Sequence, residues 1–300
     1  MKLLVALLSL VIPLGLGTRM PVPDDNPLTD EKIAQGRQLF SDTRLSRDGT
    51  VSCATCHDSA RAFSKPDPVT PGVFGRKGAR NAPTLVNLAW ASSFFWDGRA
   101  FSLEEQVLKP IADPNEMDLD PGEAAQRVGL TRDELGRRLA SYVRTLLSGN
   151  SRYDQFMNGD RTALTLEEQR GLRLFTGRGM CLSCHDGPHL SDGRAHNTGI
   201  AWQPADDRPG APGRFLDRGA AAISGRASEV GAFKTPTLRE ISRTAPYMHD
   251  GSLATLEEVV DFYDRGGRPN PNLDREMRPL EFTDDAKKAL VAFLKTLDGR

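Results

Sequence analysis

Every cysteine in the chain belongs to one of two motifs that place two thiols and an imidazole within five residues. The first motif, CATCH, runs from Cys53 to His57, and the second, CLSCH, runs from Cys181 to His185. Such a group could bind zinc, exchange a disulfide or attach a haem. Zinc would need four ligands, which two neighbouring cysteine pairs could supply, but this leaves the histidine after each pair unexplained. A thioredoxin-like pair is expected between a strand and a helix, and the flanking residues do not have that pattern.

Covalent attachment of haem accounts for all three side chains of each motif. In a c-type site the two thiols add to the haem vinyl groups, and the histidine that follows coordinates the iron. Because two such motifs use every cysteine, the sequence predicts two covalently bound haem c groups. The haem-binding residues would be Cys53, Cys56 and His57 for the first group and Cys181, Cys184 and His185 for the second. Attachment alone does not separate an electron carrier, which fills both axial positions of its iron, from an enzyme, which leaves one open.

The same order of predicted elements surrounds both motifs. A helix that begins at a threonine cap, Thr29 or Thr165, and ends in the pattern Gly-x-x-Leu-Phe precedes each motif. Each half then ends with an amphipathic helix. This internal repeat predicts a mostly α-helical fold with two domains, residues 18–150 and 151–300, whose glycines and prolines lie mainly in connecting segments.

The first residues have the composition of a short export signal. Lys2 precedes an apolar run that ends near Pro13, and small residues follow at Gly15 and Gly17. A membrane-spanning helix needs about 20 apolar residues, so this run is too short to anchor the chain. We therefore expect residues 1–17 to be removed and the mature protein to be periplasmic, with no membrane span. With 39 basic and 40 acidic residues, the chain has no charge excess that would indicate nucleic-acid binding.

Beyond the two motifs, the mature sequence resembles the bacterial dihaem cytochrome c peroxidase and MauG family. The resemblance rests on both motifs and on three segments, RNAPTLVN (80–87), FFWDGRAFSLEEQVLKPIADPNEM (94–117) and KTPTLREISRTAPYMHDGSLATLEEVV (234–260). It implies two cytochrome c-like domains. It also implies that the haem on His57 reacts with peroxide and that the haem on His185 transfers electrons. Trp96 matches the tryptophan that lies between the two haems in this family.

The resemblance places three residues, Gln106, Pro110 and Glu116, beside the open position of the first iron. Splitting peroxide requires a base that takes a proton from one oxygen and returns it to the departing one, and a carboxylate in a restricted pocket can do both. Glu116 is therefore expected to be the base. Gln106 would orient peroxide by hydrogen bonds, and Pro110 would limit the space over the iron.

The first iron is expected to be open without reductive activation. Many family members carry a histidine in the loop after the first motif that blocks this iron until the second haem is reduced, but this chain has Val73 there. No histidine occurs between His57 and His185. Met117 is the remaining alternative as a sixth ligand.

At the second iron, Tyr263 stands where high-potential family members supply a methionine. It follows His249 by 14 residues and lies on the apolar face of a predicted helix. A thioether favours reduced iron, whereas a phenolate is hard and anionic and favours higher oxidation states. This resembles the MauG arrangement, in which each iron could hold one oxidising equivalent as Fe(IV). Met248 and Met277 are the lesser alternatives.

The resemblance further implies a calcium ion between the domains. Asn81, Thr244 and Pro246 occupy the matching positions, and calcium prefers such oxygen ligands. His189 and His196 are expected to be structural residues or contacts of the haem propionates, and not iron ligands.

Three functions follow from these residues. The leading hypothesis is a periplasmic peroxidase that reduces hydrogen peroxide to water with electrons from a small cytochrome c or a copper protein. The second is a MauG-like enzyme that oxidises residues of a docked protein through a bis-Fe(IV) state. Gly179 counts against it, because the MauG pattern has a tryptophan two residues before the second motif. The third is a non-catalytic dihaem electron carrier. The resemblance also suggests a homodimer.

Overall fold

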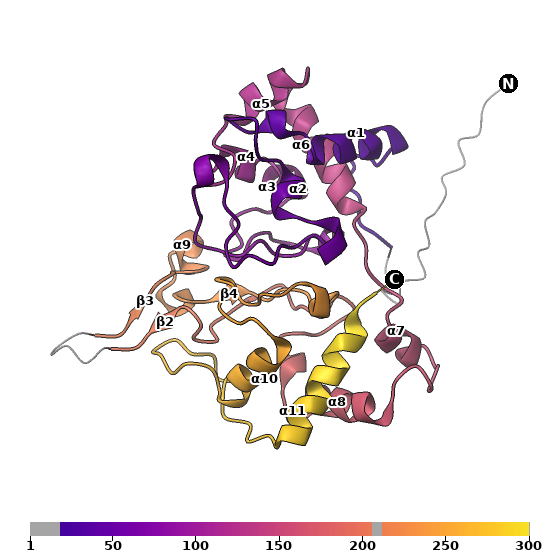
Figure 1. Cartoon of the computed structure of the whole chain (residues 1–300), viewed down its shortest axis with the longest axis vertical. Helices are drawn as coiled ribbons and strands as arrows, with labels where there is room; N and C mark the ends of the chain where they lie inside the picture. Colours follow the sequence, from indigo (N-terminus) through magenta and orange to yellow (C-terminus); the bar gives the residue numbers. More distant parts are fainter. Residues whose placement is uncertain (1–18, 206–211, 300) are drawn as a thin grey trace.

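The computed structural model describes residues 19–205 and 212–299 (Figure 1). The export signal expected over residues 1–17 lies outside this range. Helices form most of the regular structure that is described, as predicted, and they are joined by long irregular segments. Within the described residues, no helix is long and apolar enough to cross a bilayer.

The first half of the chain contributes six α-helices, which form the upper part of the molecule in Figure 1. They are α1 (Asp30–Phe40), α2 (Cys53–Cys56), α3 (Leu103–Gln106), α4 (Lys109–Ala112), α5 (Pro121–Arg127) and α6 (Arg132–Arg144). Thr29 caps α1 by accepting a hydrogen bond from the Lys32 backbone N–H, and α6 begins with a capping box between Thr131 and Glu134. α1 packs along α6.

The second half contributes five α-helices and four short strands. They are α7 (Arg152–Met157), α8 (Leu166–Thr176), α9 (Ala221–Ser224), α10 (Leu256–Asp264), α11 (Asp284–Leu294), β1 (Ala195–His196), β2 (Trp202–Gln203), β3 (Arg214–Phe215) and β4 (Phe233–Lys234). β1 pairs antiparallel with β4, and β2 pairs antiparallel with β3. α8 packs along α11, as α1 does along α6.

The glycine of each Gly-x-x-Leu-Phe pattern lies directly against the backbone of a neighbouring helix. A Cβ atom on Gly36 would lie 2.0 Å from the carbonyl oxygen of Arg138 on α6. A Cβ atom on Gly171 would likewise lie 2.0 Å from the carbonyl oxygen of Ala289 on α11. The repeated glycine is therefore required by backbone contact between helices, because any side chain would push the pair apart.

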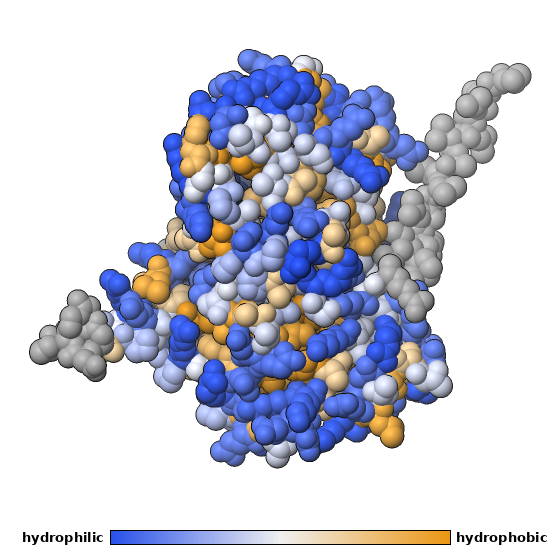
Figure 2. Space-filling model, in the orientation of Figure 1, coloured by the Kyte–Doolittle hydropathy of each residue, from blue (hydrophilic) through white to orange (hydrophobic). Residues whose placement is uncertain are grey.

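The buried apolar residues form two large clusters and one small one. The first large cluster is drawn from residues 39–146 and the second from residues 175–297. The small cluster includes Phe233 and Phe262, with Trp96 and Tyr263 packed against it. Figure 2 shows that hydrophilic residues cover most of the visible face around smaller apolar patches.

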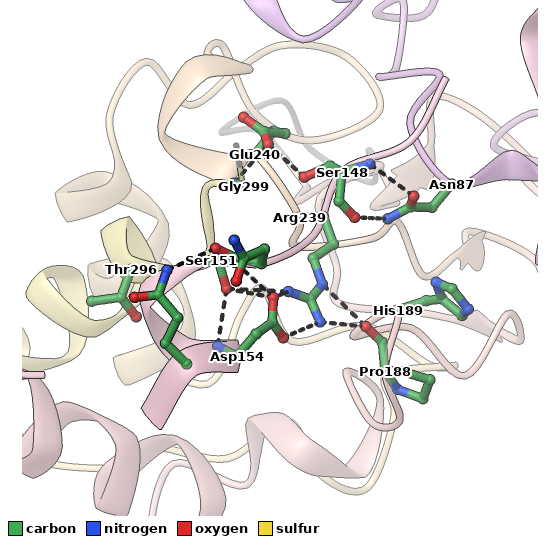
Figure 3. Close-up of polar contacts among 12 residues, drawn as sticks. Asn87, Ser148, Ser151, Asp154, Pro188, His189, Arg239, Glu240, Thr296 and Gly299 are labelled. Atoms are coloured by element: carbon green, nitrogen blue, oxygen red, sulfur yellow. Dashed lines mark hydrogen bonds and ion pairs between the residues drawn. The ribbon is translucent and has the colours of Figure 1, made fainter. Parts of the chain in front are cut away.

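A buried polar network fixes the segment that joins the two halves (Figure 3). Asn87 donates from its amide to the Ser148 carbonyl at 2.9 Å and accepts from the Ser148 N–H at 3.0 Å. Ser148 also donates from its hydroxyl to Glu240. Further along, Arg239 and Asp154 form a fully buried ion pair at 2.6 Å. These contacts tie the connecting segment to both halves of the molecule.

Candidate functional site

Both CxxCH motifs hold their histidine in the same way. His57 donates from Nδ1 to the carbonyl oxygen of Phe63 at 2.9 Å, and His185 donates from Nδ1 to the carbonyl oxygen of Leu190 at 3.0 Å. A carbonyl oxygen can only accept, so each Nδ1 carries the proton and each Nε2 keeps its lone pair. This is the arrangement in which an outer hydrogen bond orients a histidine ligand toward a metal.

The two motifs face two different cavities. The first cavity, of about 290 Å³, is lined by Cys56 and His57. The second, of about 210 Å³, is lined by Cys181, Cys184 and His185. The cysteine pairs therefore lie apart, and a four-thiolate zinc site is not formed. No cluster of three or more His, Cys, Asp or Glu side chains within residues 19–205 and 212–299 could hold a metal ion.

The chemistry of both cavities fits a c-type haem. Apolar side chains such as Leu85 and Phe94 line the first cavity, and Phe175 and Leu290 are among those that line the second. Burial raises the pKa of the Cys53 thiol to about 12, and it raises that of Cys56 to about 11. These thiols are neutral at pH 7, unlike the attacking thiolate of a redox-active pair. An apolar slot with an orientated imidazole and a CxxCH thiol on its lining suits a covalently bound porphyrin, and the second cavity has both thiols of its motif there.

The three residues predicted beside the first iron all line the cavity of His57. Gln106 ends α3, Pro110 lies in α4, and Glu116 follows α4. Burial raises the pKa of Glu116 to about 7, with a further contribution from Asp113 and a smaller opposing effect of Arg99. Near neutral pH this carboxyl is thus able both to take up and to release a proton.

The loop after the first motif supports the backbone of Glu116. Val73 donates from its backbone N–H to the carbonyl oxygen of Glu116 at 2.8 Å. Gly72 lies so close that a Cβ there would be 2.1 Å from the carbonyl oxygen of Asn115. The Val73 side chain is completely buried in the first core, as is nearly all of Met117, and neither residue lines the first cavity.

His189, from the second half of the chain, lines the first cavity. Its ring lies 4.7 Å from that of Trp90, centroid to centroid. Among the described residues, neither of its ring nitrogens has a hydrogen-bond partner, nor does Trp90 Nε1, and all three atoms are buried. The sequence linked His189 only to structure or to haem propionates. Its contact with the first cavity depends on how the halves pack, so no local pattern revealed it.

Each ring nitrogen of His196 contacts a carboxylate. Its Nδ1 lies 2.6 Å from Asp274, and its Nε2 lies 2.9 Å from Asp192. Asp274, Cys184 and Asp192 together raise the pKa of His196 to about 11. A charged imidazole held by two carboxylates has no free nitrogen for iron, which agrees with the structural role expected of it.

Tyr263 lies on α10 and lines the second cavity. Within residues 19–205 and 212–299 its hydroxyl makes no hydrogen bond. Burial raises the pKa of this phenol, and the thiols of Cys181 and Cys184 raise it further. Met248 and Met277, the alternative ligands, line the same cavity. The assignment of Tyr263 to the second iron therefore stays a prediction.

Trp96 lies in the wall shared by the two cavities and lines both. It donates from Nε1 to the carbonyl oxygen of Asn81 at 2.9 Å. Its own carbonyl oxygen accepts from the backbone N–H of Lys234 at 2.8 Å, while Asn81 donates from its backbone N–H to the carbonyl oxygen of His249 at 2.6 Å. Residues from both halves are thus connected through their backbones at this wall.

Trp96 and His249 occupy matching turns. Phe94 and Ala100 bridge the first turn, and Tyr247 and Leu253 bridge the second, each around an Asp-Gly pair. The sequences DGRAFSLEE and DGSLATLEE, which follow Trp96 and His249, show this similarity. The sequence does not predict that His249 and Lys234 lie in the wall between the cavities. Only the packing of the halves brings them there.

The three residues expected to bind calcium, Asn81, Thr244 and Pro246, all line the second cavity. The Asn81 amide donates to the carbonyl oxygens of Asp67 and Pro68, at 3.2 Å each. This leaves its side-chain oxygen as the available ligand atom. Calcium binding stays a prediction that this placement permits.

Comparison with known proteins gives one consistent family. Residues 30–135 match the family model of the di-haem cytochrome c peroxidases. The methylamine utilization protein MauG of Methylorubrum extorquens is 39% identical over 298 residues, covering 93% of this chain and 81% of that protein. The cytochrome-c peroxidase IdrP2 of Denitromonas iodatirespirans is 36% identical, covering 95% of this chain and 86% of that protein.

Solved structures agree with this. A MauG-like protein associated with microbial copper homeostasis superposes with a TM-score of 0.82 at 34% identity, over 93% of this chain and 92% of that one. The diheme peroxidase BthA of Burkholderia thailandensis gives a TM-score of 0.76 at 26% identity, over 96% and 92% of the two chains. The family implies two c-type haems, for which both cavities are suited. The chain therefore belongs to the dihaem cytochrome c peroxidase and MauG family, whose members are oxidoreductases that act on peroxide.

Proposed function

We propose that this protein is an exported, periplasmic dihaem peroxidase. It reduces hydrogen peroxide to water with electrons from a small cytochrome c or copper protein, and it needs no reductive activation. Residues 18–150 form the cytochrome c-like domain with the peroxide site, and residues 151–300 form the one that receives electrons. The observation that carries the proposal is Glu116, a carboxyl with a pKa of about 7 in the cavity of His57.

Different side chains of the first cavity transfer the proton, orient peroxide and limit the space around it. Bound haem supplies the redox chemistry, namely the two electrons that peroxide takes up. Glu116 accepts a proton from one peroxide oxygen and returns it to the other, which leaves as water. Gln106 orients peroxide by hydrogen bonds, and Pro110 restricts the space beside it. One peroxide, two electrons and two protons give two waters.

The remaining residues serve electron transfer and assembly. Tyr263 and His185, which both line the second cavity, would hold the second haem iron, and Trp96 would relay electrons between the two sites. Asn81, Thr244 and Pro246 bind a calcium ion at the second cavity. The resemblance also suggests a homodimer, and size-exclusion chromatography with light scattering measures the mass that tests it. Repeating the measurement with a calcium chelator shows whether the oligomeric state depends on calcium.

Steady-state turnover tests the peroxidase. Purified protein with two haems per chain should oxidise reduced cytochrome c or a reduced copper protein when peroxide is added, without prior reduction. A protein that carries two attached haems but consumes no peroxide would contradict the proposal. If both ferric haems were also six-coordinate and low-spin, the protein would be an electron carrier.

A MauG-like activity is the second candidate. It is favoured by Tyr263 at the second cavity and by the 39% identity to MauG. Gly179 speaks against it, because no tryptophan precedes the second motif there. The peroxide-oxidised protein can be trapped and mixed with fractionated periplasmic proteins. Rapid quenching by one fraction, with oxidised residues found in a protein of that fraction, would assign this activity, whereas quenching only by small electron donors would support the peroxidase.

A further inference from the structure

Lys234 is held by its backbone in the wall between the two cavities. It is the last residue of β4, where it pairs with Ala195 of β1. On the other side its N–H donates to the carbonyl oxygen of Trp96 at 2.8 Å. Lys234 lines both the first and the second cavity. Its position is therefore set by both halves of the chain.

The ammonium group of Lys234 has no counterion in the protein. Within residues 19–205 and 212–299, Nζ makes no hydrogen bond and no ion pair. Burial lowers the pKa of Lys234, and Asp192 opposes this only in part. The carboxylate of Asp192 already accepts from Arg194 at 2.9 Å and from His196 at 2.9 Å. Lys234 is partly buried, and a partly desolvated cation without a partner is unfavourable, so an anion from outside the chain is expected here.

Unlike Lys234, the two arginines that line the first cavity have acidic partners. Arg80 pairs with Asp97 and Asp217, and Arg99 pairs with Asp97 and lies over the ring of Phe95. Their charges are satisfied by the protein itself. Lys234 differs from them both in lacking an acid and in reaching both cavities.

We propose that Lys234 Nζ binds a haem propionate in the assembled protein, and that it is a fixed positive charge placed between the two haem sites. The propionates are the anionic groups that a haem brings, and a carboxylate pairs well with an ammonium that has no other partner. The inference rests on the proposed attachment of haem at both motifs. It assigns Lys234 a role in cofactor binding and in tuning the reduction potentials. A nearby cation favours the reduced haem, because reduction adds negative charge.

The test compares Lys234→Met with Lys234→Arg, which keeps the charge, and with Lys288→Met, which removes the same charge from the exposed surface of α11. The midpoint potential of each haem is measured by spectroelectrochemical titration without peroxide. Lys234→Met should lower the potential of the haem whose propionate it binds, or of both if the ammonium is shared. Lys234→Arg should preserve most of the parental potential, and Lys288→Met should change neither.

Resonance Raman spectra give a second readout, since the propionate bending bands report hydrogen bonding to the carboxylate. These bands should shift in Lys234→Met and in Lys234→Arg and stay unchanged in Lys288→Met. Unchanged potentials and unchanged bands in a Lys234→Met protein with two haems and the parental melting temperature would overturn the proposal. If Lys234→Met fails to fold, the Lys234→Arg variant takes its place as the test. Propionate bands identical to those of the parent in Lys234→Arg would also overturn the proposal. The haem-to-protein ratio of the parent separately measures whether both haems are attached.

Discussion

The indole of Trp96 and the imidazole of His249 meet edge to face, with ring centroids 6.5 Å apart and planes at 72°. They come from matching turns of the two halves, and Asn81 links these turns, because its carbonyl oxygen accepts from Trp96 Nε1 and its N–H donates to the carbonyl oxygen of His249. Trp96 lines both cavities and His249 lines the second. The wall between the two sites is thus built from residues that neither half could position alone.

Glu116→Gln should abolish most peroxide turnover. The amide can neither take nor return a proton, so kcat/KM for peroxide should fall by about 10²–10⁴-fold. In the parent, kcat/KM should rise with pH and level off above about pH 7, because the carboxylate is the active form. Glu123→Gln, at an exposed position of α5, is the matched control and should leave the profile unchanged. A Glu116→Gln protein with parental kcat/KM would contradict the assignment.

Glu116 should also impose a pH dependence on stability. Its pKa is about 7 in the folded protein against an ordinary value of 4.5, so between these values the folded protein holds a proton that the unfolded chain has released. For this group the free energy of unfolding therefore falls as pH rises from about 4.5 to about 7. Chemical denaturation at pH 5 and pH 8 should show Glu116→Gln gaining stability over the parent at pH 8. An equal difference at both values would speak against a raised pKa.

Tyr263→Met should change the second haem and spare the first. If Tyr263 is the ligand, electron paramagnetic resonance of the oxidised parent should show one high-spin and one low-spin ferric signal, and the substitution should alter only the low-spin one. A thioether should also raise the potential of that haem, because it favours reduced iron. Tyr142→Phe, in the first core, is the control. An unaltered low-spin signal would point to Met248 or Met277 instead.

Asp154→Asn should destabilise the protein by about 3–5 kcal/mol, because it leaves the guanidinium of Arg239 buried without its counterion. Equilibrium denaturation measures the change in the free energy of unfolding. Glu257→Gln breaks the exposed pair with Lys295 and should cost about 0–1 kcal/mol. If both variants lost a similar amount of unfolding free energy, the network in Figure 3 would not stabilise the contact between the two halves.

Gly171→Ala should destabilise the contact of α8 with α11. The new methyl would lie 2.0 Å from the carbonyl oxygen of Ala289, so the helices must separate, at a cost of about 1–3 kcal/mol. Gly78→Ala is the control, since nothing lies within 4 Å of a Cβ there. Thermal unfolding of both variants tests this, and a Gly171→Ala protein that melts with the parent would show that the helices adjust freely.

The helices and their ends were predictable because they depend on neighbours in the chain. Thr131 and Glu134 form the capping box that their spacing predicts, and the face of α10 that carries Tyr263 follows helical periodicity. The strands were not predictable, because each has only two residues and forms where distant segments pair. The long irregular segments likewise take their course from packing and not from local preference.

The sequence by itself was enough to predict the covalent attachment of haem. The spacing of Cys53, Cys56 and His57, and its repetition at the second motif, predicts both haem sites because a c-type motif is local in the chain. Tertiary structure alone decided which residues share a cavity. It brings His189 to the first cavity and sets Lys234 between both, since these positions follow from the packing of two halves and no local spacing encodes that packing.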